Sequence, residues 1–222
     1  MRLSVVIPAL DEAGRIAAAI RSATADGVEI LVVDGGSRDG TPERAAAAGA
    51  RVLHSPPGRA RQLGVGAGEA RGEAVVLLHA DTVLPDGWVT ALEAALADPR
   101  CVGGSFRLRF AERSPALAVV EWGARLRVAL FGLPYGDQAL FARRSALERI
   151  GGVPQVGFLE DLDLVRRLRC EGALARVALS VSTSARRYRA RGVLRSVLRN
   201  TAALLGWRLG VDRERLAAWY RG

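Results

Sequence analysis

The sequence predicts an α/β fold in which a mostly parallel sheet is flanked by helices. Through the first third of the chain, short apolar segments of strand length alternate with helical patterns. Parallel strands are joined by crossover helices and are buried on both faces, so continuous apolar strands are typical of such a sheet. With 222 residues, half of them hydrophobic, the chain is long enough for one domain with its own core.

In the first part of the chain the strands are short apolar runs, and the segments between them have helical periodicity or helix-start residues. The predicted strands are residues 3–8, 29–33, 52–53 and 73–79. The predicted helices are residues 11–25, with Ile16 and Ile20 on one face, and residues 41–48, with Thr41 as cap and Pro42 at the first position. A loop and a helix are expected within residues 58–72.

The second part is less regular, and its predicted elements are more varied in length. Residues 103–110 alternate between polar and apolar side chains, as an exposed edge strand would. The other predicted strands are residues 138–141 and 173–181. Helices are predicted at residues 85–97, 114–131, 145–150, 162–171 and 193–209, with a short one after Asp212. We divide the chain into a catalytic domain, residues 1–185, and a helical tail, residues 186–222.

Charge and composition exclude several classes of protein. The net charge is +9, and residues 186–222, with ten arginines and two acidic residues, account for +8 of it. The sequence contains no lysine, which excludes a P-loop lysine, a Schiff-base lysine and a lysine nucleophile. No apolar run is long enough to span a membrane and no signal peptide is recognisable, so we expect a cytoplasmic protein. Cys101 and Cys170 are accordingly expected to be reduced and buried.

Acidic residues recur where the predicted parallel strands end. The segments are Pro-Ala-Leu-Asp-Glu at residues 8–12, Asp-Gly-Gly-Ser at 34–37 and His-Ala-Asp-Thr at 79–82. Ligands bind at the carboxyl ends of strands in open parallel sheets. A solvated turn carboxylate would explain any one of these segments, but three in succession favour a ligand site.

These segments resemble the successive signatures of family 2 glycosyltransferases with the GT-A fold. The resemblance continues through Gly-Asp-Gln at 136–138, Ile-Gly-Gly-Val-Pro at 150–154 and Leu-Glu-Asp-Leu-Asp at 159–163, and it covers residues 3 to about 172. The ending at 183–188, with its basic tail, is similar to a compact bacterial subgroup described as radical-SAM/selenodomain-associated transferases. The resemblance implies a Rossmann-like sheet, transfer of a sugar from a nucleoside diphosphate to an acceptor hydroxyl, and a divalent cation, Mn²⁺ or Mg²⁺.

The same resemblance assigns residues to the donor. Pro8, Ala9 and Glu12 would line the nucleoside pocket, Asp34 would hydrogen-bond the base, and Ser37 would lie beside it. Gln62 stands where the family usually has asparagine, and Arg59 and Arg61 would lie beside the anionic donor, although they could also be ordinary surface charges. The remaining donor-side residues are Ala80 and Arg187, the latter near the diphosphate.

His79-Ala80-Asp81 occupies the place of the family's Asp-x-Asp motif. Asp81 would be the essential metal ligand, because one carboxylate together with phosphate oxygens and waters can hold a divalent ion. His79 departs from the motif. It is a candidate nitrogen ligand, which would favour manganese, or else a hydrogen-bond partner of ribose or backbone.

Glu160 and Asp161 open a predicted helix, where a carboxylate can be a simple cap. The resemblance instead makes Asp161 the general base of an inverting transfer. It places Glu160 on the acceptor side together with Gly136, Asp137 and Gln138. Asp163 is expected in the solvated first turn of that helix. Ser184 and Tyr188 replace the ends of the Gln-x-x-Arg-Trp motif of processive relatives, which indicates a single transfer.

Three alternatives are weaker or of a different class. Gly64, Gly66 and Gly68 have the wrong spacing for a dinucleotide-binding dehydrogenase. Residues 8–12 lack the glycine-rich basic loop of a nucleotidyltransferase. A catalytically silent sugar-nucleotide-binding or membrane-surface module stays open, although Asp81 and Asp161 argue against it.

The tail is a basic amphipathic segment. Its apolar residues fall near one face of the predicted helix, and Trp207, Trp219 and Tyr220 are residue types found at membrane interfaces. The apolar set is Val193, Leu194, Val197, Leu198, Leu205 and Leu209. The tail could bind an anionic membrane, or pack on the catalytic domain or on a second subunit in a homodimer. No nucleic-acid-reading motif is present.

Overall fold

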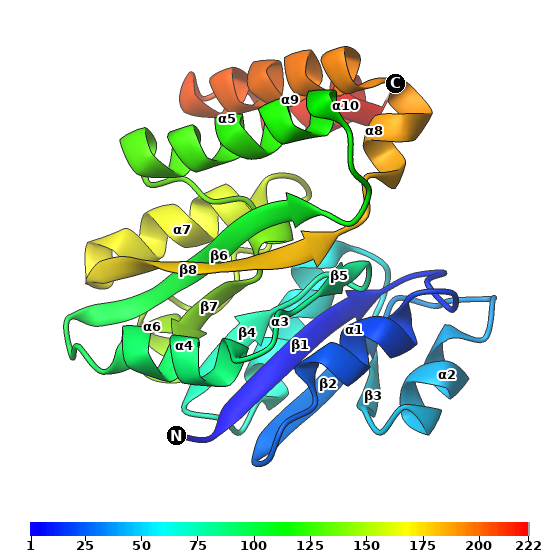
Figure 1. Cartoon of the computed structure of the whole chain (residues 1–222), viewed down its shortest axis with the longest axis vertical. Coiled ribbons are helices and arrows are strands. Elements are labelled where there is room, and N and C mark those ends of the chain that lie inside the picture. Colours follow the sequence, from blue (N-terminus) through cyan, green and yellow to red (C-terminus); the bar gives the residue numbers. More distant parts are fainter. Residues whose placement is uncertain (222) are drawn as a thin grey trace.

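The computed structural model describes residues 1–221, the last of them in its backbone only, and its described part contains one eight-stranded sheet in the order β3-β2-β1-β4-β7-β6-β8-β5 (Figure 1). All strands are parallel except β7 and β5, which run antiparallel to their neighbours. The mostly parallel sheet is therefore confirmed. The strands are β1 Leu3–Ala9, β2 Val28–Asp34, β3 Arg51–His54, β4 Ala74–Leu77, β5 Thr82–Val83, β6 Cys101–Phe110, β7 Leu140–Arg143 and β8 Ala173–Thr183.

Helices cover both faces of this sheet. Consecutive strand residues point to opposite faces, so each strand contributes apolar side chains to two separate cores. Val5 and Ile7 belong to one core cluster with Trp88 and Leu92, whereas Val6 belongs to a second cluster. The helices are α1 Ile16–Ala23, α2 Thr41–Ala47, α3 Arg59–Glu69, α4 Trp88–Leu96, α5 Pro115–Phe131, α6 Arg144–Arg149, α7 Glu160–Glu171, α8 Arg186–Arg191, α9 Val193–Arg208 and α10 Arg213–Arg221, with a short 3₁₀ helix η1 Gly136–Gln138.

Strand β6 is not at an exposed edge, so that prediction is wrong. It lies between β7 and β8, and its first six residues are buried. Only its last residues alternate, because the pairing with β7 involves Gly103 and Gly104 alone. A side chain at either glycine would collide with the carbonyl oxygen of Phe141 or of Ala175. The two glycines therefore let β6 pair closely on both sides.

Three smaller expectations are also corrected. Helix α1 begins at Ile16 rather than at residue 11, because Asp11 and the next residues form a loop bonded to the segment after β2. Cys101 is buried, but Cys170 is exposed on α7. Asp163 is not solvated, because its carboxylate binds the tail.

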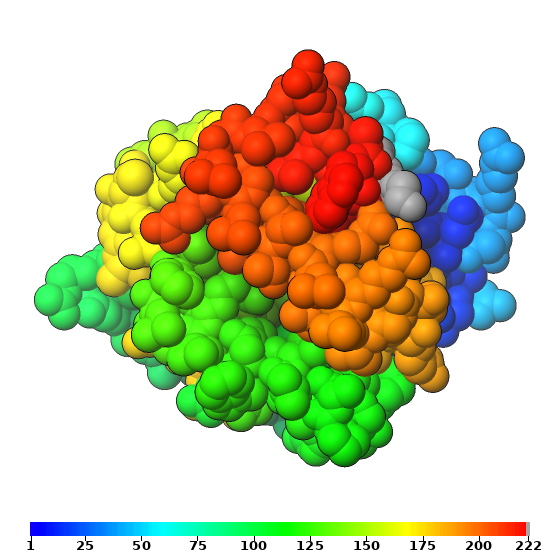
Figure 2. Space-filling view, turned by 90° about the horizontal axis from the view of Figure 1, so that it is seen from above, coloured from blue at the N-terminus to red at the C-terminus, as the bar shows by residue number. Residues whose placement is uncertain are grey.

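The tail packs on the rest of the protein. Asp163 accepts hydrogen bonds from Trp207 Nε1 at 2.9 Å and from Arg213 Nη2 at 2.6 Å. The Tyr220 ring lies 4.8 Å from that of Phe158 between centroids. Helix α9 runs beside α5, as both views show (Figures 1 and 2), and Figure 1 shows both helices on the outer side of β6 and β8. None of the described helices is both long and apolar enough to cross a membrane.

Candidate functional site

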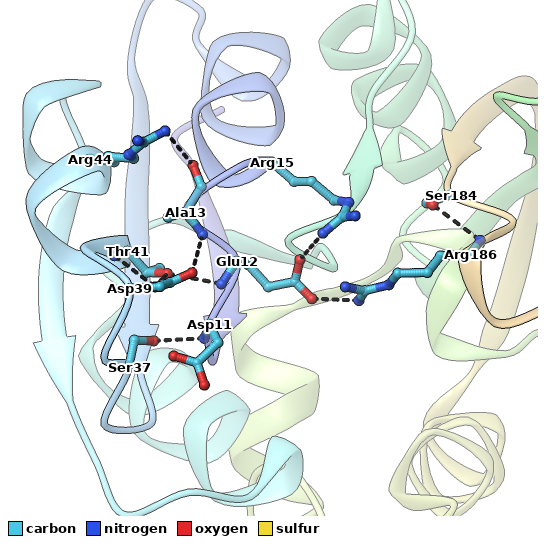
Figure 3. Close-up of polar contacts among 10 residues, drawn as sticks. All are labelled: Asp11, Glu12, Ala13, Arg15, Ser37, Asp39, Thr41, Arg44, Ser184 and Arg186. Carbon is cyan, nitrogen blue, oxygen red and sulfur yellow. Dashed lines mark hydrogen bonds and ion pairs between the residues drawn. The ribbon is translucent and has the colours of Figure 1, made fainter. Parts of the chain in front are cut away.

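The loops that follow β1 and β2 are locked together at the carboxyl end of the sheet (Figure 3). The backbone N–H of Asp11 donates to Ser37 Oγ, that of Glu12 to Thr41 Oγ1 and that of Ala13 to Asp39 Oδ2, each at 2.9 Å. Asp11 has a φ of 53°, which is uncommon for a residue other than glycine. These bonds hold the first loop in a strained conformation beside the second.

Asp34 is the last residue of β2, and its side chain is buried beneath the second loop. Its Oδ2 accepts from the backbone N–H groups of Gly36 and Ser37 at 2.9 and 3.0 Å. Its Oδ1 is buried without a hydrogen-bond partner among the described residues. A buried acceptor of this kind is costly unless a ligand satisfies it.

Glu12 and Gln62 join neighbouring segments of the protein. The Glu12 carboxylate pairs with Arg15 at 3.0 Å and with Arg186 of α8 at 2.7 Å, which links the first loop to the tail (Figure 3). The Gln62 amide is buried and donates to the carbonyl oxygens of Ala9 and Val33 at 2.7 and 2.8 Å. Its amide thus joins the ends of β1 and β2.

A cavity of about 550 Å³ opens beside these loops, and it contains many of the predicted site residues. Its lining includes Arg59, Arg61, His79, Asp81, Asp137, Glu160, Asp161 and Arg187. The lining does not include the other predicted residues, which are Pro8, Ala9, Glu12, Asp34, Ser37, Gln62, Ala80, Gly136 and Gln138. The candidates for metal and base therefore share one cavity, whereas the predicted nucleoside-binding residues lie outside its lining.

Asp161 and His79 approach each other around Gly136. The backbone N–H of Gly136 donates to Asp161 Oδ2 at 2.7 Å, and that of Leu162 donates to Asp161 Oδ1 at 2.9 Å. A Cβ at Gly136 would lie 3.0 Å from His79 Nε2 and 3.3 Å from Asp161 Oδ2. The missing side chain thus makes room for both groups, and two backbone amides fix the orientation of the carboxylate.

Burial shifts the pKa values of three other groups in the cavity. It lowers the pKa of His79 well below its ordinary value, assisted by the positive charges of Arg59 and Arg187, so the imidazole is neutral at pH 7. Burial also raises the pKa of Asp81, although Arg187 opposes this. The pKa of Asp137 is raised by burial too, and its Oδ1 has no partner among the described residues.

The start of α7 is held by α3. Arg59 Nε donates to Glu160 Oε1 in a partly buried ion pair. Leu159, which precedes α7, has a φ of 56°, and Ala139, which follows η1, has a φ of 44°. Such strain in residues other than glycine concentrates at functional sites. Here it lies on the two segments that present Asp161 and Asp137.

The tail supplies a wall of the cavity, which the sequence did not predict. Tyr188, Arg191, Arg199, Asn200 and Tyr220 line it, together with Phe158 before α7. Arg199 Nη2 donates to the backbone carbonyl oxygens of Trp219 and Tyr220, and so fixes α10 against α9. The basic, amphipathic pattern of the tail indicated a helix with an apolar face, but no local signal indicated what that helix would cover.

No group of three or more His, Cys, Asp and Glu side chains that could hold a metal ion occurs among residues 1–221. Asp81 fits a different kind of site. Its half-buried carboxylate lines the cavity within the influence of Arg187, and neutral His79 lies two residues away. A hard oxygen ligand of this kind suits a divalent cation that takes its remaining ligands from a bound anion and water.

Comparison with known proteins decides the family. The sequence profile of glycosyl transferase family 2 matches residues 4–150, which is more than half of the chain. This chain belongs to that family. The curved, mostly parallel sheet with helices on both faces is the GT-A fold, as the resemblance implied.

Among its relatives is a glucosyl-3-phosphoglycerate synthase from Mycolicibacterium paratuberculosis, 38% identical over 96 residues. That match covers 37% of this chain and 29% of the relative, so less than a third of the relative's length is spanned. A solved glucosyl-3-phosphoglycerate synthase from Mycobacterium tuberculosis, in complex with Mn²⁺, UDP and glucosyl-3-phosphoglycerate, is 25% identical with a TM-score of 0.66. The alignment covers 95% of this chain and 81% of that one.

A mannosyltransferase from Pyrobaculum calidifontis, in complex with GDP-Man and Mn²⁺, has a TM-score of 0.69 at 23% identity. The alignment covers 91% of this family 2 chain and 61% of that one. This likeness concerns the fold alone.

Proposed function

We propose that this family 2 chain transfers a sugar, a hexose or a related glycosyl group, from a nucleoside diphosphate to an acceptor hydroxyl in the cavity. The observation that carries the proposal is the meeting of Asp81, Asp161 and neutral His79 around one cavity at the carboxyl end of the sheet. The UDP, Mn²⁺ and Mg²⁺ bound in the structurally similar glucosyl-3-phosphoglycerate synthases support a nucleotide-sugar donor and a divalent cation.

On the donor side, Asp81 would hold the cation, which when bound neutralises the negative charge of the diphosphate. Arg187, which lies close enough to influence the pKa of Asp81, would bind the same phosphates. His79 is neutral and has a lone pair to ligate the ion or to accept a hydrogen bond from ribose. The unpartnered Oδ1 of Asp34 suits an N–H donor of the base.

On the acceptor side, Asp161 would take the proton of the attacking hydroxyl. Its two oxygens are oriented by the amides of Gly136 and Leu162, which pre-orient the carboxylate for this role. The acceptor oxygen then forms its bond to the anomeric carbon as the bond to the diphosphate breaks. Attack from the face opposite the diphosphate inverts that carbon.

Several finer predictions stand with this proposal. They are a single rather than a processive transfer, membership of the radical-SAM/selenodomain-associated subgroup, and a cytoplasmic location. The chemistry of the acceptor also belongs here. Arg191, Arg199 and Asn200 on the tail wall favour an acceptor with an anionic group, and phosphoglyceric acid, bound by a structurally similar synthase, is one such compound. The alternative is a silent module that binds the nucleotide sugar without transfer.

Two variants test the proposal with nucleotide-release and donor-binding assays, each with and without Mn²⁺. Asp81→Asn should abolish release and remove the metal-dependent part of donor affinity. Asp161→Asn should leave donor binding within about twofold and lower turnover roughly 10²–10⁴-fold, the usual contribution of a positioned base.

Asp98→Asn, at an exposed carboxylate remote from the cavity, is the matched control and should change neither quantity. Full turnover in excess chelator would refute the role of Asp81. If the unmodified chain binds the donor but releases no nucleotide with any acceptor offered, the result would favour the silent module.

A further inference from the structure

Helix α5 exposes an apolar stripe although its other face is already buried. Val119, Trp122, Leu126 and Leu130 follow one another at spacings of three and four residues, and they are 66%, 63%, 41% and 66% exposed. The opposite face packs on the protein through Leu117, Glu121, Ala124 and Val128. A surface helix normally presents polar side chains to water, so an apolar outer face indicates a contact with something else.

Helix α9 carries a second stripe of the same kind. Leu194, Leu198 and Leu205 are 73%, 60% and 54% exposed, and Leu209, directly after the helix, is 81% exposed. The inner side of α9 packs through Ala203, Leu204 and Trp207. The two helices lie side by side and share the side of the molecule seen in Figure 2. We call their two exposed stripes together the α5/α9 face.

The exposed charged residues of the two helices are all positive. Arg125 on α5 and Arg195 and Arg208 on α9 are exposed. Glu121 is the sole acidic residue in either helix, and it is buried, where it accepts a hydrogen bond from the backbone N–H of Phe110. A helix pair whose exposed stripes are apolar and whose exposed charges are arginines complements a layer that is apolar inside and anionic at its surface.

A groove at the end of the face has the same chemistry. It measures about 490 Å³ and lies between the end of α5, α7 and α9. Its lining consists of Leu130, Phe131, Leu133, Arg166, Arg169, Trp207 and Arg208. It thus combines apolar residues and an indole with three guanidinium groups and no carboxylate. This composition suits a phosphate headgroup with the beginning of an acyl chain below it.

We propose that the α5/α9 face binds to the surface of a phospholipid membrane containing anionic lipids. Its apolar side chains would enter the boundary between headgroups and acyl chains, and Arg125, Arg195 and Arg208 would bind the phosphates. A second copy of the chain is a poorer partner, because a twofold contact would bring arginines against arginines with no exposed carboxylate from either helix. The proposal extends the predicted tail contact to α5 and does not depend on the proposed transfer.

The position of α9 gives this contact a consequence for the cavity. Ser196, Arg199 and Asn200 on its inner side line the cavity, while Leu194 and Leu198 point outward. A bound membrane would therefore lie directly against the helix that forms one wall of the cavity.

Co-sedimentation of the full chain with vesicles tests the proposal. The probes are vesicles of phosphatidylcholine alone and vesicles with about 30% phosphatidylglycerol. We expect binding to the anionic vesicles at least tenfold tighter than to the neutral ones, and weaker binding as salt increases. Arg195→Gln with Arg208→Gln should weaken binding about 30-fold, given the usual contribution of an arginine near anionic lipid. Leu126→Ser with Leu198→Ser should weaken it at least tenfold without a change in charge.

Arg2→Gln with Arg71→Gln is the matched control, because it removes the same charge elsewhere. The backbone N–H groups of Arg2 and Arg71 bond to Glu73 and Glu29 beside the start of β1, at the amino-terminal end of the molecule, which is remote from α5 and α9 (Figure 1). Vesicle binding by this control that is nearly unchanged supports the proposal. A loss of binding as large as that of the arginine variant on the α5/α9 face overturns the proposal in favour of nonspecific charge attraction. Absence of binding to anionic vesicles at low salt also overturns it. Light scattering tests the remaining alternative. If the parent chain binds no vesicles but forms a stable dimer, and Leu126→Ser with Leu198→Ser converts that dimer to a monomer, the face belongs to a contact with a second copy.

Discussion

Replacing Asp163 by alanine should release the tail from α7. Asp163 accepts from Trp207 Nε1 at 2.9 Å and from Arg213 Nη2 at 2.6 and 2.8 Å. The Asp163 and Arg213 side chains are only 16% and 27% exposed, so neither is fully hydrated in the folded protein. Hydrogen bonds to charged groups contribute about 1.5–3 kcal/mol. Truncation also leaves the indole N–H and the guanidinium partly buried without this partner, and we expect a loss of about 2–4 kcal/mol in tail docking.

Limited trypsin digestion measures this loss directly, because the tail is rich in arginine. Cleavage within residues 186–221 should be slow in the parent chain and at least about 30-fold faster in Asp163→Ala, when cleavage follows the population of the opened tail. Asp163→Asn keeps an acceptor for Trp207 and should fall between the two. Glu148→Ala is the control, since its ion pair with Arg144 is 59% and 46% exposed and contributes only about 0.3–0.5 kcal/mol.

A double-mutant cycle with Arg213→Ala separates the pair from the tail as a whole. The two single variants should be strongly non-additive, because each removes the same contact. Equal tail cleavage in the parent chain and in Asp163→Ala would refute the reasoning. Additive effects of the two substitutions would show that the tail is held by other contacts.

Two further substitutions test the cavity. Gly136→Ala would place a Cβ 3.0 Å from His79 Nε2 and 3.3 Å from Asp161 Oδ2, so nucleotide release should fall at least tenfold with little change in melting temperature. Gly123→Ala in α5, where a Cβ meets nothing within 4 Å, is its control, and equal activity of the two variants would contradict the geometry. Asp137→Asn should stabilise the protein at pH 7 by about 1–3 kcal/mol, because burial raises the folded pKa of Asp137 and its Oδ1 has no hydrogen-bond partner to offset the loss of hydration. The folded pKa of Asp137 is above the unfolded one, so this gain should disappear below about pH 3.8, where the carboxyl is protonated in both states. Urea denaturation of both proteins at the two pH values measures the difference in unfolding free energy. An Asp137→Asn variant no more stable than the parent chain at pH 7 would contradict the prediction.

Much of the amino-terminal part of the fold could be predicted because the information for it is local in the sequence. Apolar runs indicated β1, β2 and β4, and parallel strands bring their carboxyl ends to one edge of the sheet. The sequence alone therefore predicts that the segments containing Asp34 and Asp81 lie near each other. Asp161 was expected there only through the resemblance to family 2, since a carboxylate opening a helix is otherwise an ordinary cap. The roles of these residues stay predictions.

The tertiary structure decided what local patterns do not contain. The alternation in residues 107–110 is the same whether a strand lies at an edge or extends beyond a shorter neighbour, and only the pairing of β6 with β7 and β8 distinguishes the two. Asp163 has the sequence signature of a solvated first turn, but Arg213, fifty residues later, makes it part of the tail contact. The sequence by itself determined that the tail is a basic helix with an apolar face. The tertiary structure decides which side of that helix meets the cavity and which side joins α5 in an exposed apolar surface. Both depend on contacts between segments far apart in the chain, and the periodicity within one segment carries no information about such contacts.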